Sequence, residues 1–437
     1  MGDLATGNLH LLKRPMSLRL FHTADWHLGQ LFHNFDREVE HDHFLAWLLE
    51  TLAARKPDAL LLAGDVFDSI NPPASAQRRF YQFLAKARSV CPKLQIVVTA
   101  GNHDAASRLE APSALLDSLG IRVVGTVVRD AEGVIDADRF IVPLHNLAGE
   151  VEALALAVPF LRPADVPSDP EAKDPYLDGI RAFYRLVIDR ADAVRKERHP
   201  QAALVALGHC HLNGTEESRD SERRLIIGGS EALGLDVFPS TLAYVALGHL
   251  HKPQEIDGGR ICYSGSPIPL SFAERDYSHR VLEVTLADGR FASSQALPIP
   301  KKVSLLRMPA SGAVEMQALL RLIAALPTET TSPPAEHPFL EVHVLVTAPD
   351  PTRRRTIEEA LRGKAARLAL IKLENSLPAD SGTTDLPAST AADLGSLSPE
   401  ALMVAAHVER YRTEPDPALR HALQEILTQD AVGHSSL

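Results

Sequence analysis

Short apolar segments alternate with stretches of helical periodicity between residues 18 and 286, and this alternation constrains the fold more than any other feature. The apolar segments are four to six residues long and rich in Val, Leu and Ile, which is typical of strands buried on both faces. They cover residues 18–23, 59–63, 95–100, 121–124, 203–207 and 244–247. Helices are expected over 36–55, 74–90 and 113–119. The pattern therefore predicts an α/β fold in which sheet packs against helices.

Polar side chains follow five of these apolar segments directly. They are Asp25 and His27 after the first segment, Asp65 after the second, Asn102, His103 and Asp104 after the third, His209 after the fifth, and His249 and His251 after the sixth. Because sites in open α/β sheets form outside the carboxyl ends of strands, these side chains are expected to converge. Their oxygen and nitrogen atoms suit Mn, Fe, Zn or Mg. They are too many for one ion, and Asp65 lies in the middle of the set, where a carboxylate can bridge two ions.

Each of these residues also has an ordinary structural explanation when it is taken singly. A lone Asp after a strand is usually a turn or a helix cap, and a lone His is usually a hydrogen-bonded structural residue. Their occurrence after five strands favours a site over coincidence. For Asp68, capping or support of a ligand is favoured over ligation, and His22 and His145 are assigned structural roles.

Charge and cysteine content narrow the functional classes. The net charge of −11 argues against a free-standing nucleic-acid binder, so any such contact must draw on bound metals, a local basic patch or a partner. Three scattered cysteines make no disulfide framework and favour a cytoplasmic location. No apolar run is long enough to span a bilayer. Residues 1–15 lack the features of a signal peptide and are expected to form a disordered leader.

The chain changes character near residues 298–300. Residues 301–374 show a β-α-β-α-β pattern with helices over 313–325 and 352–368, which predicts a compact second domain of split βαβ type. Residues 375–396 are crowded with Ser, Thr, Pro and Ala and are expected to be a linker. Residues 397–430 contain two short amphipathic helices, which are expected to dock onto a partner or onto the body of the protein.

The ordered polar motifs resemble the signature of the calcineurin-like metallophosphoesterases. The signature consists of D-x-H, GD-x-x-D, GNH-D, a later GH and a final GH-x-H, and all five pieces occur here in that order. "YVALGHLHKPQ" and "CYSGSPIPLSFAERD" further resemble the SbcD family, the nuclease subunits of bacterial SbcCD complexes. The resemblance extends from residue 16 onward. It implies a nuclease domain of two sheets flanked by helices over 16–298, a small α+β capping domain over 301–374 and a C-terminal helix pair.

The resemblance also implies roles for particular residues. By motif position, Asp25, His27, Asp65 and His251 would hold one divalent ion, and Asp65, Asn102, His209 and His249 would hold a second, with Mn²⁺ as the expected metal. His103 would protonate the leaving 3′ oxygen or stabilise the transition state, and Asp104 is a candidate to orient it.

The function implied by the resemblance is that of a DNA nuclease subunit under ATP control. Its partner would be an SbcC-type coiled-coil ATPase. Two copies of this chain would form a homodimer inside a heterotetramer with that partner. Its activities would be 3′–5′ exonuclease on duplex DNA and endonuclease on single strands and hairpins. Candidate DNA contacts are Arg353, Arg354 and Arg355, with Arg362, Lys364 and Arg367 nearby, although a solvated helix face explains them equally well. Two alternatives are a stand-alone phosphodiesterase, disfavoured by the capping domain and docking tail, and a non-catalytic scaffold, disfavoured by the complete ligand sets.

Overall fold

The structure is a computed structural model of the whole chain. It describes residues 17–169, 171–218, 232–328, 332–346 and 350–375, together with a few positions between 403 and 419. The predicted leader, linker and C-terminal helix pair lie largely outside the described residues, so what the sequence indicates for them stays a prediction.

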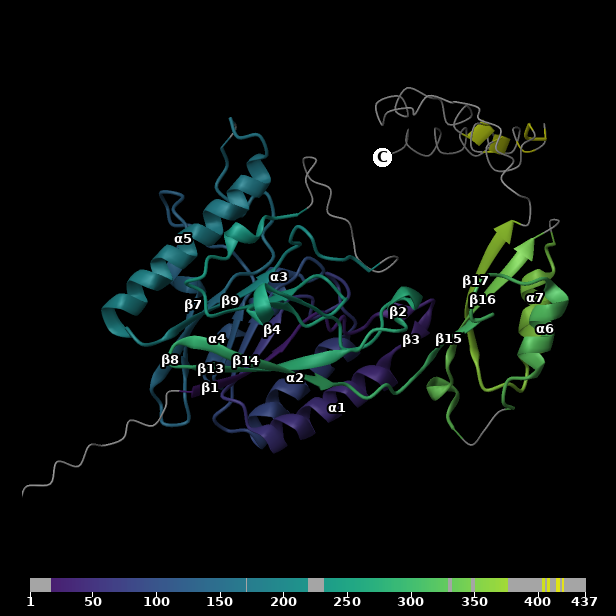
Figure 1. Cartoon of the computed structure of the whole chain (residues 1–437), viewed down its shortest axis with the longest axis horizontal. Helices are drawn as coiled ribbons and strands as arrows, with labels where there is room; N and C mark the ends of the chain where they lie inside the picture. Colours follow the sequence, from purple (N-terminus) through teal and green to yellow (C-terminus); the bar gives the residue numbers. More distant parts are fainter. Residues whose placement is uncertain are drawn as a thin grey trace, which may run out of the picture. The chain divides into compact units, whose positions relative to one another are not determined.

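Two mixed sheets of six strands each form the body of the described chain (Figure 1). The first sheet has the order β14-β13-β1-β4-β5-β6, and its strands β1, β4, β5 and β6 run parallel to one another. In that order, the strands span Arg290–Pro298, Arg280–Ala287, Ser17–Thr23, Ala59–Ala63, Gln95–Thr99 and Ile121–Val124. Strands β13 and β14 add an antiparallel edge next to β1.

The second sheet repeats this plan with the order β11-β12-β10-β9-β8-β7. Its four inner strands are parallel, and β11 and β7 are antiparallel to their neighbours. In that order, the strands span Gln254–Ile256, Ile261–Tyr263, Tyr244–Gly248, Ala203–His209, Val151–Ala157 and Ile141–His145. The parallel strands of both sheets include the five that precede the polar motifs.

Alternation of side chains along β1 explains why the sheets and helices form layers. Leu18 and Leu20 belong to the core cluster that includes β8, β9 and β10 of the second sheet. Phe21 points to the other face, where it packs with α1 (Glu38–Arg55) and α2 (Ala74–Val90). Helix α5 (Pro175–Arg198) packs against the second sheet. The result is the predicted sandwich of two sheets flanked by helices.

Two histidines assigned to structural roles have them. His22 on β1 reaches the second sheet, where its Nδ1 lies 2.9 Å from the Tyr244 hydroxyl and its Nε2 lies 3.2 Å from the Leu247 carbonyl oxygen. His145 is exposed, and its Nδ1 lies 3.0 Å from Oε1 of Gln95.

Smaller elements complete the body. They are the hairpin of β2 (Leu31–Phe32) and β3 (Phe35–Asp36), and the short helices α3 (Ala106–Glu110) and α4 (Ser113–Asp117). No element was predicted from the sequence over β7, β8, α5 or β11 to β14, so nearly half of the body was not anticipated in detail. Among the described residues, no helix is both long and apolar enough to cross a membrane.

Residues 305–375 form a three-stranded sheet with two helices. In chain order, the elements are β15 (Leu305–Met308), α6 (Met316–Ala324), β16 (Phe339–Val346), α7 (Arg353–Ala360) and β17 (Arg367–Asn375). The three strands are adjacent and parallel, so the split arrangement predicted for this region is wrong. The helix predicted over 352–368 is also too long, because the chain leaves α7 after Ala360 and Gly363 takes a positive φ of 70° before β17 begins.

A cluster of aromatic side chains connects this three-stranded sheet to the body. Phe32 and Phe272 of the body pack with Leu305 and Phe339 of the small sheet. The Phe339 ring also contacts two guanidinium groups, and its centroid lies 5.4 Å from Cζ of Arg37 and 3.8 Å from Cζ of Arg367.

Candidate metal centre

The polar motifs form loops at the carboxyl ends of β1 and β4 that hold each other in place. The backbone N–H of Asp25 donates to the Gly64 carbonyl at 3.1 Å, and that of His27 donates to the Asp65 carbonyl at 3.1 Å. Asp25, His27, Asp65 and His249 all have positive φ, at 54°, 44°, 47° and 95°. Each such conformation costs on the order of 1–3 kcal/mol for a residue other than glycine and tends to occur at functional sites.

Two glycines allow these loops to approach closely. A Cβ at Gly101 would overlap both the backbone nitrogen and Oδ1 of Asp65. A Cβ at Gly248 would overlap the Ala63 carbonyl oxygen and press on the His209 ring. The first approach is between the loops after the neighbouring strands β4 and β5, and the second is between the two sheets. Neither was predicted from the sequence, since both follow from tertiary packing.

Asp65 lies at the centre of the polar cluster. Its Oδ2 is 3.5 Å from Nε2 of His27 and 3.4 Å from Nε2 of His209, so one oxygen atom faces an imidazole from each sheet. Its Oδ1 accepts a hydrogen bond from the His103 backbone N–H at 2.9 Å. The side chain is nearly fully buried. A carboxylate in this position has the placement that a bridging ligand requires.

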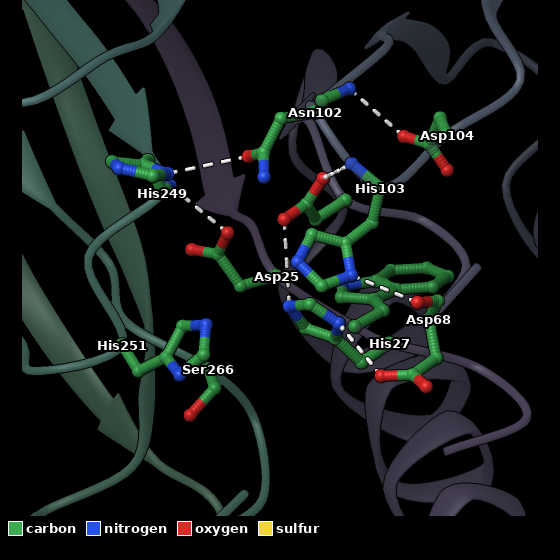
Figure 2. Close-up of polar contacts among 12 residues, drawn as sticks. Asp25, His27, Asp68, Asn102, His103, Asp104, His249, His251 and Ser266 are labelled. Atoms are coloured by element: carbon green, nitrogen blue, oxygen red, sulfur yellow. Dashed lines mark hydrogen bonds and ion pairs between the residues drawn. The ribbon is translucent and has the colours of Figure 1, made fainter. Parts of the chain in front are cut away.

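Asn102 and two histidines form one side of the cluster. Oδ1 of Asn102 lies 2.9 Å from Nε2 of His209 and 3.3 Å from Nδ1 of His249 (Figure 2). The His249 backbone N–H donates to Oδ1 of Asp25 at 2.9 Å. These contacts join residues that follow β1, β5, β9 and β10 into one site.

Asp25, His27 and His251 form the other side. One potential ligand atom from each lies within 4.8 Å of those of the other two, and the same holds for Asp25, Asp65 and His209. The His27 and His251 rings are 5.1 Å apart between centroids. All seven residues predicted as metal ligands therefore lie in a single cluster.

The imidazoles are anchored from outside the cluster. Nδ1 of His209 lies 3.0 Å from the Ala63 carbonyl oxygen, and Nδ1 of His27 lies 3.2 Å from Oδ1 of Asp68. Asp68 therefore supports a predicted ligand, which is the role favoured for it from the sequence.

His103 is held beside the cluster. Its Nδ1 lies 2.8 Å from the Asp68 backbone oxygen, and its ring meets the His27 ring edge to face at 4.7 Å between centroids. The residue is 8% exposed. Figure 2 shows it beside His27 and Asp25.

Asp104 holds the loops beneath the cluster. Its carboxylate is fully buried and accepts hydrogen bonds from the backbone N–H groups of Gly101, Val66 and Phe67, at 2.8, 3.1 and 2.9 Å. These contacts fix the loops that carry Asp65 and Asn102, whereas Nδ1 of His103 contacts the Asp68 backbone oxygen. Asp104 is therefore a positioning residue for the loops, and the expectation that it orients His103 stays a prediction.

Burial and mutual charge shift the pKa values in the pocket. Burial raises the pKa of Asp25 to about 6, despite the nearby histidines. Burial acts in the same direction on Asp65, but His209 and the other imidazoles around it outweigh this effect and hold the pKa of Asp65 below its usual range. Burial lowers the pKa of His209, while Asp65 and Asp25 outweigh it and raise the value to about 9. Burial and the neighbouring His209 lower the pKa of His249 well below normal.

The donor set fits divalent cations. Oδ2 of Asp25 and Nε2 of His27 are buried without a hydrogen-bond partner among the described residues. Such atoms are costly to leave unpaired, and a cation would satisfy both. Carboxylate, amide and imidazole ligands without thiolate suit hard or borderline divalent ions.

Several of the basic residues suggested for DNA contact are already paired with other groups of the protein. Arg354 pairs with Glu358 at 2.7 Å and Arg355 with Glu359 at 3.0 Å, both on α7. Lys364 donates to the carbonyl oxygens of Ala324 and Leu326 after α6. Arg367 packs over Phe339 and donates to the His337 carbonyl. Lys364 and Arg367 therefore have structural roles, and Arg353, Arg354, Arg355 and Arg362 remain as candidates.

The fold and the donor set define a class of enzyme, and comparison with known proteins agrees. Residues 18–253 match the family model of calcineurin-like phosphoesterases, which spans more than half of the chain, and residues 303–411 match the model described as the Type 5 capsule protein repressor C-terminal domain. The protein is thus a metal-dependent phosphoesterase of the calcineurin-like class.

Curated relatives specify the family further. The chain is 42% identical over 399 residues to the SbcD subunit of the SbcCD nuclease of Rhodobacter capsulatus, which covers 89% of this chain and 94% of the relative. It is 34% identical over 290 residues to the protein of that name from Escherichia coli K12, and the match covers 65% of this chain and 68% of the relative. It is 35% identical over 302 residues to the protein of that name from Bacillus subtilis, and the match covers 67% of this chain and 73% of the relative. The chain belongs to the SbcD family of calcineurin-like phosphoesterases.

Proposed function

We propose that this protein is the nuclease subunit of an SbcCD-type complex and hydrolyses DNA phosphodiesters with two divalent metal ions. The observation that carries the proposal is the position of Asp65, whose Oδ2 faces His27 on one side and His209 on the other. The relatives are named as nucleases, which supports a nucleic acid as the substrate.

The proposed ligands fall into two groups that share Asp65. Asp25, His27, Asp65 and His251 would hold one ion, and Asp65, Asn102, His209 and His249 would hold the other. Two bound divalent ions, for which we propose Mn²⁺, would supply charge stabilisation for the transferred phosphate and activate the attacking water. Asn102 offers an oxygen ligand without adding negative charge to a pocket that already contains two buried carboxylates.

We assign proton donation to His103. Because its Nδ1 lies against the Asp68 carbonyl oxygen, which only accepts hydrogen bonds, Nδ1 carries a hydrogen and Nε2 is the atom that exchanges a proton with the substrate. In the imidazolium form, Nε2 would donate to the departing 3′ oxygen as the P–O bond breaks.

His103→Asn tests this assignment. We expect the variant to bind Mn²⁺ as the wild type does, because His103 lies outside both ligand groups, but to lose about 10²–10⁴-fold in cleavage of linear duplex DNA, the usual contribution of a general acid. Calorimetric Mn²⁺ titration and a nuclease assay measure the two effects, and His145→Asn, at an exposed position, serves as the control. Wild-type cleavage by the His103 variant would remove the residue from this role.

The partner we propose is an SbcC-type coiled-coil ATPase that regulates cleavage, contacted through residues 397–430. The net charge of −11 supports a partner that supplies much of the positive surface for DNA. Deleting residues 398–437 should abolish co-purification with the ATPase and leave Mn²⁺-dependent hydrolysis of a small phosphodiester unchanged. Undiminished co-purification of the truncated chain would rule out this docking segment.

The substrate range we propose is DNA ends and hairpins, with 3′–5′ exonuclease activity on duplexes and endonuclease activity on single strands. The stand-alone phosphodiesterase is the alternative, and it predicts that the small substrate is hydrolysed while linear DNA is not, even with the ATPase present. A non-catalytic scaffold predicts hydrolysis of neither.

We further propose that the protein is a cytoplasmic homodimer within the complex. All three cysteines are free, in keeping with a reducing compartment. A groove of about 610 Å³ lies between α2 and α4, and its walls are mainly apolar. Leu115 is 67% exposed and lies beside Leu116, Leu119 and other apolar residues of this groove, and such a contiguous apolar surface is typical of an interface.

A further inference from the structure

Glu274 is a buried carboxylate beside the candidate metal centre that the motifs in the sequence did not single out. It ends the short 3₁₀ turn Phe272–Glu274 and is fully inaccessible to solvent. Its Oε1 lies 3.0 Å from Nδ1 of His251. Its Oε2 accepts hydrogen bonds from the Leu270 backbone N–H at 2.8 Å and from the Ser266 hydroxyl at 3.2 Å. Both oxygens of the carboxylate are thus hydrogen-bonded.

The contact with Glu274 determines which nitrogen of His251 carries the hydrogen. An ionised carboxylate only accepts hydrogen bonds, so Nδ1 of His251 must be the donor in this contact. In the neutral imidazole, the lone pair then resides on Nε2. The Leu270 N–H and the Ser266 hydroxyl also donate to Glu274, and such donors leave its carboxylate the accepting partner of His251.

We propose that Glu274 is a positioning residue that holds His251 in the tautomer and orientation needed to bind a metal ion through Nε2. The inference rests on the proposed function, in which His251 is a ligand of the ion shared with Asp25, His27 and Asp65. A carboxylate that accepts from the second nitrogen of a ligating histidine fixes its ring and raises its basicity.

The surrounding loop strengthens this assignment. The Ser266 backbone N–H donates to the His251 carbonyl oxygen at 3.2 Å, while the Ser266 side chain bonds Glu274. Figure 2 shows Ser266 next to His251 at the edge of the cluster. The segment from Ser266 to Glu274 is therefore hydrogen-bonded both to the backbone of His251 and to the His251 ring. Nδ1 of His209 and Nδ1 of His27 are anchored by a carbonyl of Ala63 and by the partly exposed Asp68, whereas Nδ1 of His251 contacts the fully buried Glu274.

The variant Glu274→Gln separates charge and tautomer effects from volume. The amide oxygen can still accept from the Leu270 N–H, and the amide NH₂ is then directed at Nδ1 of His251. Because that NH₂ group is a donor, the imidazole would place its hydrogen on Nε2, which could not bind a metal ion. We expect one of two Mn²⁺ ions to bind about 10–100-fold more weakly, the usual cost of losing such a partner.

The experiment uses the full-length chain and Mn²⁺ as the probe. Electron paramagnetic resonance titration counts bound ions and their affinities, and ¹⁵N-histidine NMR of the metal-free protein reports the tautomer of His251, assigned by comparison with His251→Asn. Circular dichroism confirms that the variants fold. Glu283→Gln is the matched control, because Glu283 is also buried and charged but pairs with Arg55 and Arg19 away from the metal centre.

We expect His251 to have the Nδ1–H tautomer in the wild type and the Nε2–H tautomer in Glu274→Gln. One Mn²⁺ ion should bind more weakly to Glu274→Gln and not to the Glu283→Gln control. Glu274→Asp should recover part of the Mn²⁺ affinity that Glu274→Gln loses. The inference would be overturned if Glu274→Gln bound two ions with wild-type affinity. It would also be overturned if His251 had the Nε2–H tautomer in the wild type, a result that can be obtained without any variant. A wild type that fails to bind two ions would instead contradict the proposed function, so the two failures are distinguishable.

Discussion

At the scale of single residues, the metal centre depends on positions where the backbone has little freedom. Four of its seven predicted ligands have positive φ, and the loops that carry them meet at contacts that leave no space for a Cβ at Gly101. The side chains predicted to bind metal ions are therefore placed by backbone packing beneath them, and small changes there should act on metal affinity.

Gly101→Ala tests this dependence. The added methyl group would overlap Asp65, so we expect Mn²⁺ affinity and phosphodiester hydrolysis to fall by at least about tenfold, and the free energy of unfolding of the metal-free protein to fall by about 1–3 kcal/mol from overpacking. Gly149→Ala is the control, because its Cβ would enter open space and only its positive φ is strained. Unchanged Mn²⁺ affinity in Gly101→Ala would show that Asp65 is not held by this contact.

That the seven predicted ligands cluster could be anticipated from the sequence, because each comes at the end of an apolar strand and their types and order are specific. The residues that support the predicted ligands could not be identified from the sequence in this way. Asp104 bonds three backbone groups of two loops, and Glu274 reaches His251 from 23 positions away, so neither role leaves a local pattern. Glu274 lies within "CYSGSPIPLSFAERD", a segment noted for its resemblance, and that was the signal available.

At the scale of elements, the two sheets are joined by a buried polar bridge as well as by apolar packing. His22 of β1 bonds Tyr244 and the Leu247 carbonyl on β10, and burial, with Arg280 also contributing, lowers the pKa of His22 to about 3. The imidazole is therefore neutral in the folded protein over the whole physiological range. In the unfolded chain its pKa is about 6.5, so the unfolded state takes up a proton as pH falls below that value.

This difference predicts a loss of stability in acid. Because the folded pKa is below the unfolded one, the contribution of His22 is complete above about pH 6.5 and declines by about 1.4 kcal/mol per pH unit between about pH 6.5 and 3. His22→Gln keeps a hydrogen-bonding side chain but cannot titrate there. Urea unfolding of the metal-free protein at pH 7.5, 6 and 5 should therefore show a shallower pH slope in this variant, by about one proton, and not in His145→Gln. Equal slopes in wild type and His22→Gln would contradict the prediction.

Prediction of elements succeeded where an apolar run or helical periodicity was strong. The bounds of α2, β4 and β6 are those expected from the sequence. Helix α7 was predicted too long because its polar sequence continues with helix-forming residues past Ala360, while the positive φ of Gly363 and the pairing of β17 with β16 take the chain into the sheet. Strand order was also beyond reach, since the adjacency of β15, β16 and β17 depends on contacts far apart in the chain.

At the scale of the whole molecule, a buried aromatic contact joins the three-stranded sheet to the body. Phe339 of the small sheet packs on Phe32 and contacts the guanidinium groups of Arg37 and Arg367. Arg37 is buried and also donates to the Pro269 carbonyl at 2.9 Å, in the segment that precedes Glu274. The aromatic contact and the metal centre therefore share one supporting loop.

The apolar groove between α2 and α4 carries the prediction about assembly. If two copies associate through it, a carboxylate at its centre would have to be buried against apolar side chains, at a cost of several kcal/mol. We expect Leu115→Asp to convert a dimer into a monomer in light scattering after size exclusion, with its circular dichroism spectrum and Mn²⁺ binding unchanged. Leu147→Asp should remain dimeric, because Leu147 is similarly exposed, at 53% compared with 67% for Leu115, but lies outside the groove in the turn between β7 and β8. A Leu115→Asp protein that still dimerises would place the dimer contact elsewhere, because a strongly hydrated carboxylate cannot be covered by leucines without weakening the association.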